Sequence, residues 1–463
     1  MQNDSYWLIA SIFSALAGAV ICKSRGDHVQ ARIFHLTFSF LSAVLASIAW
    51  LVFENSPSLH HSFGIGLDSV GGAMMVLSSF LYYVVPLATQ KTKFRRVPTA
   101  ATLMSQAINV ALFSFYDNRL LILCLALSII PVLFELKARK ESARIFVFYM
   151  VLMILMIGSS YYFLSADRHS ENQETLALYI LACGILIRCG CFPLHSWIPD
   201  LVSKLSFGTG LLQTTPLIGI YLMVRLVLPI ASTDLLHNIG YLLMASVIYA
   251  AGLTLVQVEA RKFFSFTFIG LSGLAMLGII VPTRLGVAAG LCLWLSLSTA
   301  LTGFGLTIRA LESRVGRIRL DQFHGLYDQV PMFAVFFLIT GLASVGFPGT
   351  VGFAGIELLL ESMAESYPGI GLIIVLGAAL YGIAIMFAYF RMFTGKHHVS
   401  IISLTARGNE KAAILALTSL ILACGILPDP FVKTRLNAVE AILSSEKAAN
   451  PAPENIQQPG DHH

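Results

Sequence analysis

Few ionisable side chains of this sequence fall within its apolar segments, and three of them are of types that could hold or move an ion. Glu357 lies in an apolar run shortly after Pro348, Arg188 lies near the end of another run, and His195 follows it in a short polar segment. Ionisable groups at membrane depth are costly and are therefore candidate functional residues. The structural alternatives are a cap or local pair for Glu357, snorkelling of Arg188 to the surface, and a bond from His195 to a freed carbonyl.

Other charged residues are explained as readily by solvation or by local pairing. Lys204 lies in the same polar segment as His195, and Lys262 has Glu259 close by for a local ion pair. Glu361 follows Glu357 by one helical turn and is expected near an interface. Glu135 precedes a basic segment, which predicts a surface ion pair. Lys204 and Lys262 are kept as candidate ion-pathway residues with Arg188, His195 and Glu357.

Several kinds of chemistry find no support in the sequence. There is no nucleotide-binding loop, nucleophile elbow, haem motif or nucleic-acid patch, and no catalytic residue or cofactor is assigned. The histidine pairs at 60–61 and 397–398 lack further ligands, so no metal site is predicted. The cysteines are scattered and are interpreted as small buried apolar residues: Cys22, Cys124, Cys183, Cys189, Cys191, Cys292 and Cys424. An independent enzyme is therefore not expected.

The composition requires a membrane environment. Of the 463 residues, 56% are hydrophobic and 12% are charged, with a mean hydropathy of +0.77. Soluble globular domains carry about 25% charged residues. Residues 7–23 lack a cleavable small-residue site and are interpreted as a first membrane span rather than a signal peptide.

The apolar runs predict an all-α polytopic membrane protein of about fourteen transmembrane helices. Short connections favour a single helix bundle over residues 1–443, followed by a polar, disordered tail over 444–463. The predicted spans are 7–23, 31–53, 69–90, 99–115, 119–136, 145–165, 176–191, 207–229, 236–257, 263–281, 285–308, a broken span at 331–362, 370–394 and 412–428.

The charges of the connecting loops alternate along the chain. Odd-numbered loops are basic, as in KTKFRR at 91–96 and KARKESAR at 137–144, whereas the loops at 54–68, 230–235 and 363–369 contain no Lys or Arg. Because basic loops stay on the cytoplasmic side, this pattern predicts that both termini lie outside. We expect an integral protein of a bacterial inner membrane.

Two segments interrupt apolar spans at similar motifs. GCFPLHSW at 190–197 and VGFPGTVG at 345–352 share a Phe-Pro pair, and Pro193 and Pro348 are separated by about five spans. An odd number of spans between two repeats inverts their orientation, which is a common transporter architecture. The sequence thus predicts two inverted five-helix repeats, approximately 99–229 and 236–394, each with one broken helix. Asp68 is expected to cap the third helix.

Four segments resemble one known family. The most specific is FPLHSWIPD at 192–200, which is similar to a Pro-Leu-His-x-Trp-Leu-Pro-Asp motif; the others are FGIGLDSVGG at 63–72, EARKFFSFTFIGLSG at 259–273 and GLASVGFPGTVGFAGIELLLES at 341–362. They resemble the antiporter-like membrane subunits of respiratory complex I, of multi-subunit cation/proton antiporters, and of related hydrogenase and inorganic-carbon uptake complexes. The resemblance implies an ion-translocating subunit, with the proton as the expected ion, that assembles with other membrane subunits in a lipid bilayer.

The chain departs from this family at most of the charged positions that the resemblance would place along the membrane interior. Only Glu357 keeps a charge of the family's kind, and Arg188 stands where the family has a lysine. Arginine cannot release its proton in a protein, so it cannot relay one. The alternative hypothesis is therefore a degenerate, non-conducting scaffold or coupling subunit of the same fold, for example in an inorganic-carbon uptake complex. The uncharged positions are Ala126, Leu211 or Gln213, Leu295 and Thr299.

Overall fold

The chain folds into a bundle of helices in the computed structural model, and no strand occurs in the part of the chain that the structure describes. The structure describes residues 4–24, 28–55, 64–90, 94, 97–165, 171–366, 370–395 and 405–449. The histidine pairs at 60–61 and 397–398 lie outside the described residues, as does most of the basic segment 91–96.

The first part of the bundle contains α1 (Asp4–Ser24), α2 (His28–Asn55), α3 (Gly71–Leu87), α4 (Thr99–Ser114), α5 (Asn118–Leu127), α6 (Ile129–Ala138), α7 (Arg144–Leu164), α8 (Glu171–Cys189), α9 (Trp197–Lys204), α10 (Phe207–Thr214), α11 (Ile218–Leu222), the π-helix η2 (Met223–Val227) and the short η3 (Leu228–Ile230). The second part contains α12 (Thr233–Val256), α13 (Ala260–Ile280), α14 (Arg284–Val315), α15 (Pro331–Ser344), α16 (Val351–Ser366), α17 (Ile370–Phe393), α18 (Gly408–Ile426) and α19 (Pro428–Ala449).

Every predicted span overlaps one of these helices or a run of consecutive helices, so the predicted all-helical membrane fold is confirmed. Ten helical stretches of the described residues are long and apolar enough to cross a membrane, and two of them are runs of consecutive helices, α5–α6 and α10–η3. Others are shorter or interrupted, and the total of fourteen spans stays a prediction. The two inverted repeats likewise stay a prediction.

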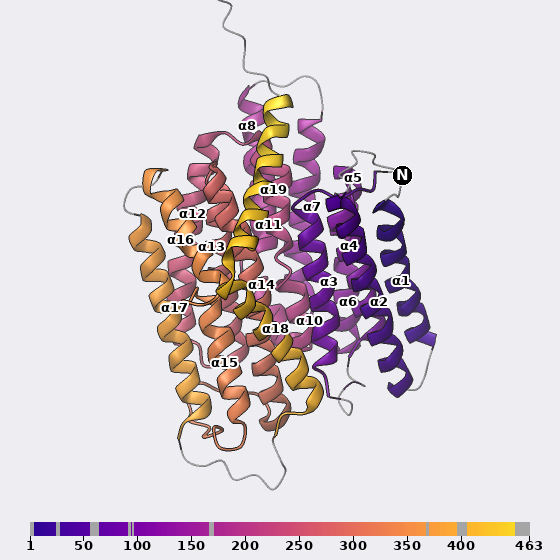
Figure 1. Ribbon diagram of the computed structural model, residues 1–463, viewed down its shortest axis with the longest axis vertical. Coiled ribbons are helices and arrows are strands. Elements are labelled where there is room, and N and C mark those ends of the chain that lie inside the picture. The colour runs from indigo at the N-terminus through magenta and orange to yellow at the C-terminus, as the bar shows by residue number, and fades with distance from the viewer. Residues whose placement is uncertain are drawn as a thin grey trace, which may run out of the picture.

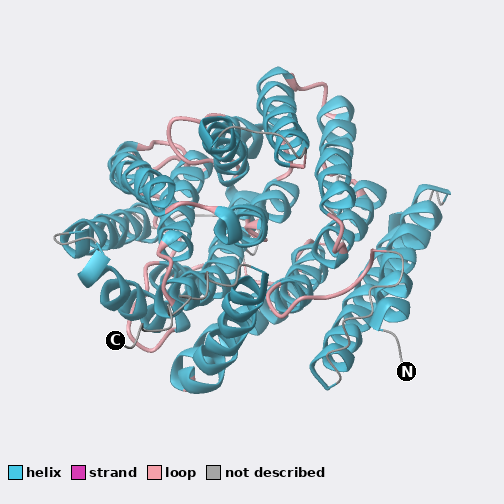
Figure 2. Cartoon of the chain, turned by 90° about the horizontal axis from the view of Figure 1, so that it is seen from above, coloured by secondary structure: helices cyan, strands magenta, loops and turns pink. Residues whose placement is uncertain are grey.

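The helices α13 and α14 form the centre of the bundle. Nearly every side chain of these two helices is buried, which is the expected property of helices that are apolar on all sides. Helices α1–α2 and α16–α17 lie at opposite edges (Figure 1), and the end-on view shows the N-terminal pair at the rim (Figure 2).

Three of the interruptions have identifiable causes. Between α10 and α11, Pro216 has no N–H to donate and Leu217 adopts a left-handed φ of 50°. Between α15 and α16, Gly346 and Gly349 have φ values of 80° and 86°, which glycine adopts without strain. The break that follows α8 contains Pro193, as the sequence predicts.

The C-terminal segment differs from its prediction. Helix α19 continues through Ala449, so the polar tail predicted to begin at residue 444 starts inside a helix. Proline and charged residues led us to expect disorder, but an ion pair between Arg284 and Glu440 at 2.7 Å joins α19 to the beginning of α14. Residues 450–463 lie outside the described residues.

Candidate ion-translocation site

Arg188 is enclosed within the bundle at the end of α8. Only 5% of the residue is exposed, so the snorkelling alternative is wrong. Its Nη2 donates to the backbone carbonyl of Gln213 on α10 at 3.2 Å, and its guanidinium lies 5.9 Å from the ring of Trp197 on α9. Among the described residues no carboxylate pairs with it, and its Nε has no hydrogen-bond partner. Helix α9, about 12 Å long at 1.5 Å per residue, separates it from the nearer end of the bundle.

Neutral polar groups from α3 and α4 lie beside this cation. The Tyr82 hydroxyl accepts a hydrogen bond from Asn109 Nδ2 at 2.9 Å and approaches the carbonyl of Leu212 at 3.5 Å. The Ser78 hydroxyl donates to Asn109 Oδ1 at 3.2 Å. Tyr82 and Arg188 are near enough to interact electrostatically. The buried cation therefore has hydroxyl, amide and carbonyl dipoles around it in place of an acid.

Backbone groups freed by the breaks of the first half have specific partners. The indole N–H of Trp197 donates to the Ile187 carbonyl at 2.9 Å, and the Phe192 N–H donates to the hydroxyl of Ser246 at 3.0 Å. At the break between α10 and α11, the indole N–H of Trp294 on α14 donates to the carbonyl of Pro216 at 3.0 Å. Such partners are what an interrupted helix requires inside a membrane.

The break between α15 and α16 is stabilised in the same way. The Ser296 hydroxyl on α14 donates to the Ala343 carbonyl at 3.4 Å. Gly425 on α18 packs directly against the backbone of Gly349, where a side chain would collide with the break. Pro348 lies in this tight turn, as the sequence predicts.

His195 lies near Arg188 in the chain but has different surroundings. Its ring is 5.3 Å from that of Tyr249 and 6.0 Å from those of Phe192 and Phe266. It also interacts with the carbonyl of Pro193, which agrees with the structural alternative. Its Nδ1 is buried and lacks a partner among the described residues.

A charged cavity of about 440 Å³ opens at the end of the bundle where α3, α6 and α14 finish and α10 and α18 begin. Lys204 lies at this cavity, with its Nζ 2.7 Å from an oxygen of Asp200, so it is paired rather than free in solvent. The cationic lining residues are Arg139, Lys204, Arg261, Arg309 and Arg317, and the acidic ones are Glu141, Glu312 and Glu410.

Glu135 lies beside the same cavity, and its ion pair is not at the surface where the sequence predicted it. Its carboxylate accepts from Arg139 Nε at 2.7 Å, as expected, but its side chain is only 2% exposed, so the pair is not at the surface. The same Oε1 accepts from the Ser206 N–H at 2.8 Å, before α10 begins, and Oε2 has no partner among the described residues.

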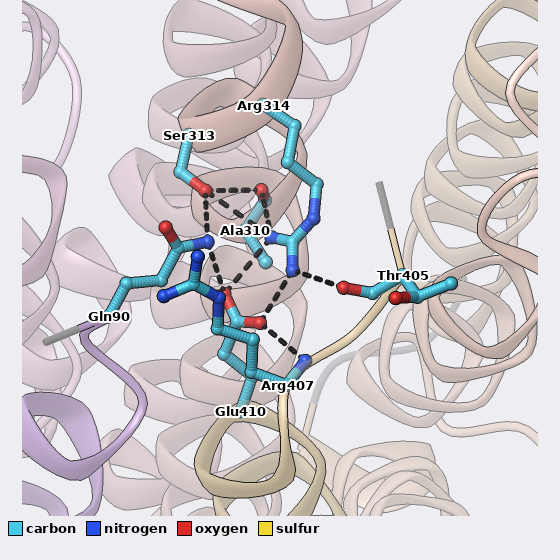
Figure 3. A network of polar contacts seen from close by, with 7 residues as sticks. All are labelled: Gln90, Ala310, Ser313, Arg314, Thr405, Arg407 and Glu410. Carbon is cyan, nitrogen blue, oxygen red and sulfur yellow. Dashed lines mark hydrogen bonds and ion pairs between the residues drawn. The ribbon is translucent and has the colours of Figure 1, made fainter. Parts of the chain in front are cut away.

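A buried ion pair joins α14 to α18 at this end (Figure 3). Arg314 and Glu410 make two contacts, at 2.6 and 3.0 Å, with side chains 6% and 3% exposed. Gln90 Nε2 donates to the same carboxylate at 3.1 Å and the Arg407 N–H donates to it at 2.9 Å. Three segments distant in sequence, those of Gln90, Arg314 and Glu410, are therefore held together at the rim of the cavity.

Asp68 lies at the opposite end of the bundle. Its Oδ1 accepts from the N–H groups of Val70 and Gly71, so the predicted cap of α3 is confirmed. Its Oδ2 also accepts from Tyr221 at 3.0 Å and from Arg225 at 3.2 Å. Arg225 belongs to the π-helix, a form that often marks functional sites.

Two predicted pathway residues are not brought to the interior. Glu357 projects from the exposed face of α16, and Glu361 lies on the same face one turn later, so the expectation of a buried Glu357 is wrong. Lys262 is 45% exposed and pairs with Glu259 at 3.2 Å, which confirms the predicted local pair. Arg188, His195 and Glu357 thus do not form one cluster.

Most positions where the family resemblance would predict charges have apolar or neutral polar side chains. Thr299 is buried, and its hydroxyl donates to the carbonyls of Leu295 and Ser296 in its own helix. Leu211 is fully buried, whereas Gln213 contributes its backbone carbonyl to Arg188. Arg188 is therefore a buried charge beside these uncharged positions.

Comparison with known proteins identifies the family of this chain. The family described as NADH:quinone oxidoreductase/Mrp antiporter, transmembrane, matches residues 106–382, which is more than half of the chain. The chain belongs to this family. The NAD(P)H-quinone oxidoreductase chain 4 of Synechococcus sp. (strain WH7803) is 24% identical, over 96% of this chain and 90% of the relative. The NADH-quinone oxidoreductase subunit M of Rickettsia prowazekii (strain Madrid E) is 22% identical, over 82% and 83%.

Solved structures agree on the fold. A chain of the Mrp complex from Dietzia sp. DQ12-45-1b superposes with a TM-score of 0.84 at 15% identity, covering 96% of this chain and 98% of that one. A chain of respiratory complex I from Thermus thermophilus gives a TM-score of 0.80 at 18% identity, covering 94% and 99%. The fold of this family member is thus that of antiporter-like membrane subunits.

Sequence reasoning missed several of the polar partners described above. Tyr82 and Asn109 lie in apolar helices. The pattern that could have identified them is the recurrence of polar residues every three or four positions, as for Ser78 and Tyr82 on α3 and for Gln106 and Asn109 on α4. Arg225 and Glu410 lie near the ends of predicted spans, where charges are common and carry little information. Each pairs with a residue more than ninety positions away, which no local pattern reveals.

Proposed function

We propose that this chain is a proton-translocating, antiporter-like membrane subunit of a larger energy-coupling complex. The observation that carries the proposal is Arg188: an arginine enclosed in an apolar bundle, without a carboxylate partner among the described residues and with hydroxyl, amide and carbonyl groups nearby. An unpaired buried charge destabilises a helix bundle. A subunit that only served as a scaffold is therefore not expected to keep one. Membership of the family supports the same reading.

The proposed path connects three polar regions. The charged cavity with Lys204 at its wall collects ions at one end, the surroundings of Arg188 and His195 form the interior part, and the Asp68–Arg225 pair lies at the other end. Arg188 acts as a fixed positive charge that orients water and dipoles, since it cannot relay a proton itself. Lys262 lies outside the interior and contributes positive charge to the surface at the cavity end.

The proposed partners are other membrane subunits of a hetero-oligomeric complex. Glu357 and Glu361 are exposed on an otherwise apolar helix at one edge of the bundle. A carboxylate facing lipid is costly, so a neighbouring subunit is expected to cover this face and supply polar contacts. In addition to the path between the two ends of the bundle, Glu357 would pass protons laterally between this chain and that subunit.

We further propose an inner-membrane location with both termini outside. All the basic odd-numbered segments that the structure describes, including Arg139 and Arg317, lie at the end with the charged cavity. Single cysteines placed in 91–96 or 137–144 should react with an impermeant thiol reagent only after the membrane is opened. Labelling from outside in intact cells would show that these segments, and not the termini, lie outside.

Proton flux through the purified complex in vesicles tests the function. Arg188→Ala should abolish most of the flux, whereas Arg188→Lys should retain a larger part because it keeps a positive charge. Thr307→Val on α14, a buried position whose hydroxyl bonds only its own helix at 2.9 Å, is the matched control. Equal flux in assembled wild-type and Arg188→Ala complexes would favour the scaffold hypothesis.

A further inference from the structure

Most of the buried side-chain atoms that lack a hydrogen-bond partner gather in one region. They belong to Arg32 (Nε and Nη2), His35 (Nε2), Ser39 (Oγ), Ser79 (Oγ), Gln106 (Oε1) and Arg188 (Nε). These residues lie on α2, α3, α4 and α8. Buried polar atoms in native proteins are nearly always bonded to protein or to ordered water, so a concentration of unbonded ones indicates bound water.

Helix α2 carries four of the polar residues of this region on one face. Arg32, His35, Ser39 and Ser42 follow one another at spacings of three or four residues, and all four are buried. Residues at these spacings share one side of a helix. The inward side of a long apolar helix is therefore polar over several turns.

Helix α4 presents a matching face. Thr99, Thr102, Gln106 and Asn109 also recur at spacings of three or four residues. Thr102, Gln106 and Asn109 are buried within α4. We name these two facing sets of residues the α2–α4 stripe.

Hydrogen bonds connect the two helices and lead toward Arg188. His35 Nδ1 lies 3.2 Å from the Thr99 carbonyl, and Gln106 Nε2 donates to the Ser39 carbonyl at 3.1 Å. Asn109, at the far end of the stripe, donates to Tyr82, whose side chain lies near Arg188. Polar contacts therefore recur from the beginning of α4 toward Arg188.

Polar side chains between membrane helices also serve simply to hold helices together. In that role donors and acceptors pair with each other across the interface. In the α2–α4 stripe two guanidinium nitrogens, one imidazole nitrogen, one amide oxygen and one hydroxyl remain without a partner among the described residues. The unbonded atoms favour water over direct helix–helix bonding.

A groove of about 750 Å³ reaches the beginning of the stripe. Lys23, His28, Phe94 and Thr99 contribute to its lining. The ring of Phe94 lies 5.8 Å from that of His35 and 5.6 Å from the guanidinium of Arg32. Phe94 thus stands between the groove and the stripe, at the end of the bundle where α4 begins.

We propose that the α2–α4 stripe is a water-filled proton branch that leads from this groove past Phe94 and His35 to the surroundings of Arg188. This inference rests on the proposed function and adds a second route by which protons reach the surroundings of Arg188. A hydronium ion on the groove side transfers its proton to His35 Nε2, forming imidazolium, while Nδ1 keeps its hydrogen toward Thr99. The same proton then leaves Nε2 for the next water, and the neutral ring is restored. No electrons move, and one proton enters for each that leaves.

Hydration can be measured independently of transport. In a variant whose native cysteines are replaced and whose flux is retained, Ser39→Cys should react with 2-aminoethyl methanethiosulfonate in the assembled complex. Ala46→Cys, on the same inward face of α2 and fully buried, should not react. Phe94→Ala should accelerate the reaction at Ser39→Cys. A Ser39→Cys that is as inert as Ala46→Cys overturns the proposal, because the stripe is then dry.

Transport separates this proposal from the proposed function. His35→Gln and Gln106→Leu should each lose most of the proton flux of the reconstituted complex, and Thr302→Val, a buried α14 residue bonded to its own helix, should lose none. If the wild type conducts and both stripe variants conduct equally well, the branch is refuted while the proposed function stands. If the wild type does not conduct, the proposed function fails, and the labelling result alone decides whether the stripe holds water.

Discussion

Removal of the carboxylate of Glu410 is expected to destabilise the bundle strongly. Glu410→Ala deletes both contacts to Arg314, the acceptor of the Gln90 amide and the acceptor of the Arg407 N–H, which caps α18. Because Arg314 is 6% exposed, its charge stays buried without an anion.

The expected loss in the free energy of unfolding depends on the contacts that Arg314 retains in Glu410→Ala. Breaking a buried ion pair by removing one partner costs about 3–5 kcal/mol. Arg314 still donates to the carbonyls of Ala310 and Thr405 and lies 4.9 Å from the ring of Phe333, so the lower end, about 3 kcal/mol, is expected. Replacing both partners with apolar residues of similar size leaves no orphan charge and is expected to cost less than the single change.

An unfolding titration of the solubilised protein with a denaturing detergent, followed by circular dichroism, measures these differences. Glu410→Ala, Arg314→Met and the combination Arg314→Met with Glu410→Leu provide the comparison. The reasoning requires the double variant to be more stable than Glu410→Ala. A loss below about 1 kcal/mol in Glu410→Ala, as for an exposed pair, would show that water reaches the site and that the pair is not buried.

Three further changes test other parts of the structure. Glu357→Gln should lower proton flux per assembled complex while partner subunits still copurify, and loss of copurification with unchanged flux would make Glu357 an interface contact only. Asp68→Asn should cost about 1 kcal/mol, because its pair with Arg225 is partly exposed, and unchanged stability in the unfolding titration would show that the cap needs no charge. Gly425→Ala should lower the free energy of unfolding by about 1–3 kcal/mol, because the added methyl group would collide with the backbone of the α15–α16 break. The control Gly382→Ala, with open space around it, should leave the stability unchanged. Equal stability of the two variants would contradict the close packing at Gly425.

The sequence predicted well those features that depend on local chemistry. Pro193 and Pro348 lack N–H groups, and glycines flank the second of them, so both breaks could be placed within a few residues. Asp68 precedes a helix, where its carboxylate suits the free N–H groups, and the cap formed as expected. The basic loops gathered at one end, as their alternation indicated.

The orientation of individual helices could not be predicted in this way. Glu357, Glu361 and Glu365 recur every four residues in the sequence of α16 and indicate one polar face, but Glu357 was considered as a single acid in an apolar run and was assigned to the wrong face. Glu135 is buried because the segment before α10, more than seventy residues later, covers it. Arg188 stays inside because α9 folds beneath it instead of leaving a route to the surface. These outcomes depend on contacts between distant segments.

The positions of the tryptophans provide a spectroscopic probe of the helix breaks. Of the four tryptophans, Trp197 and Trp294 are fully buried and donate to carbonyls freed by breaks, whereas Trp7 lies at the surface and Trp50 is partly exposed. With Trp7→Phe and Trp50→Phe in place, the intrinsic fluorescence of the chain arises from the breaks alone. Any opening that admits water to an indole would shift its emission to longer wavelength. Opening of the broken helices can therefore be followed in the purified chain without an added label.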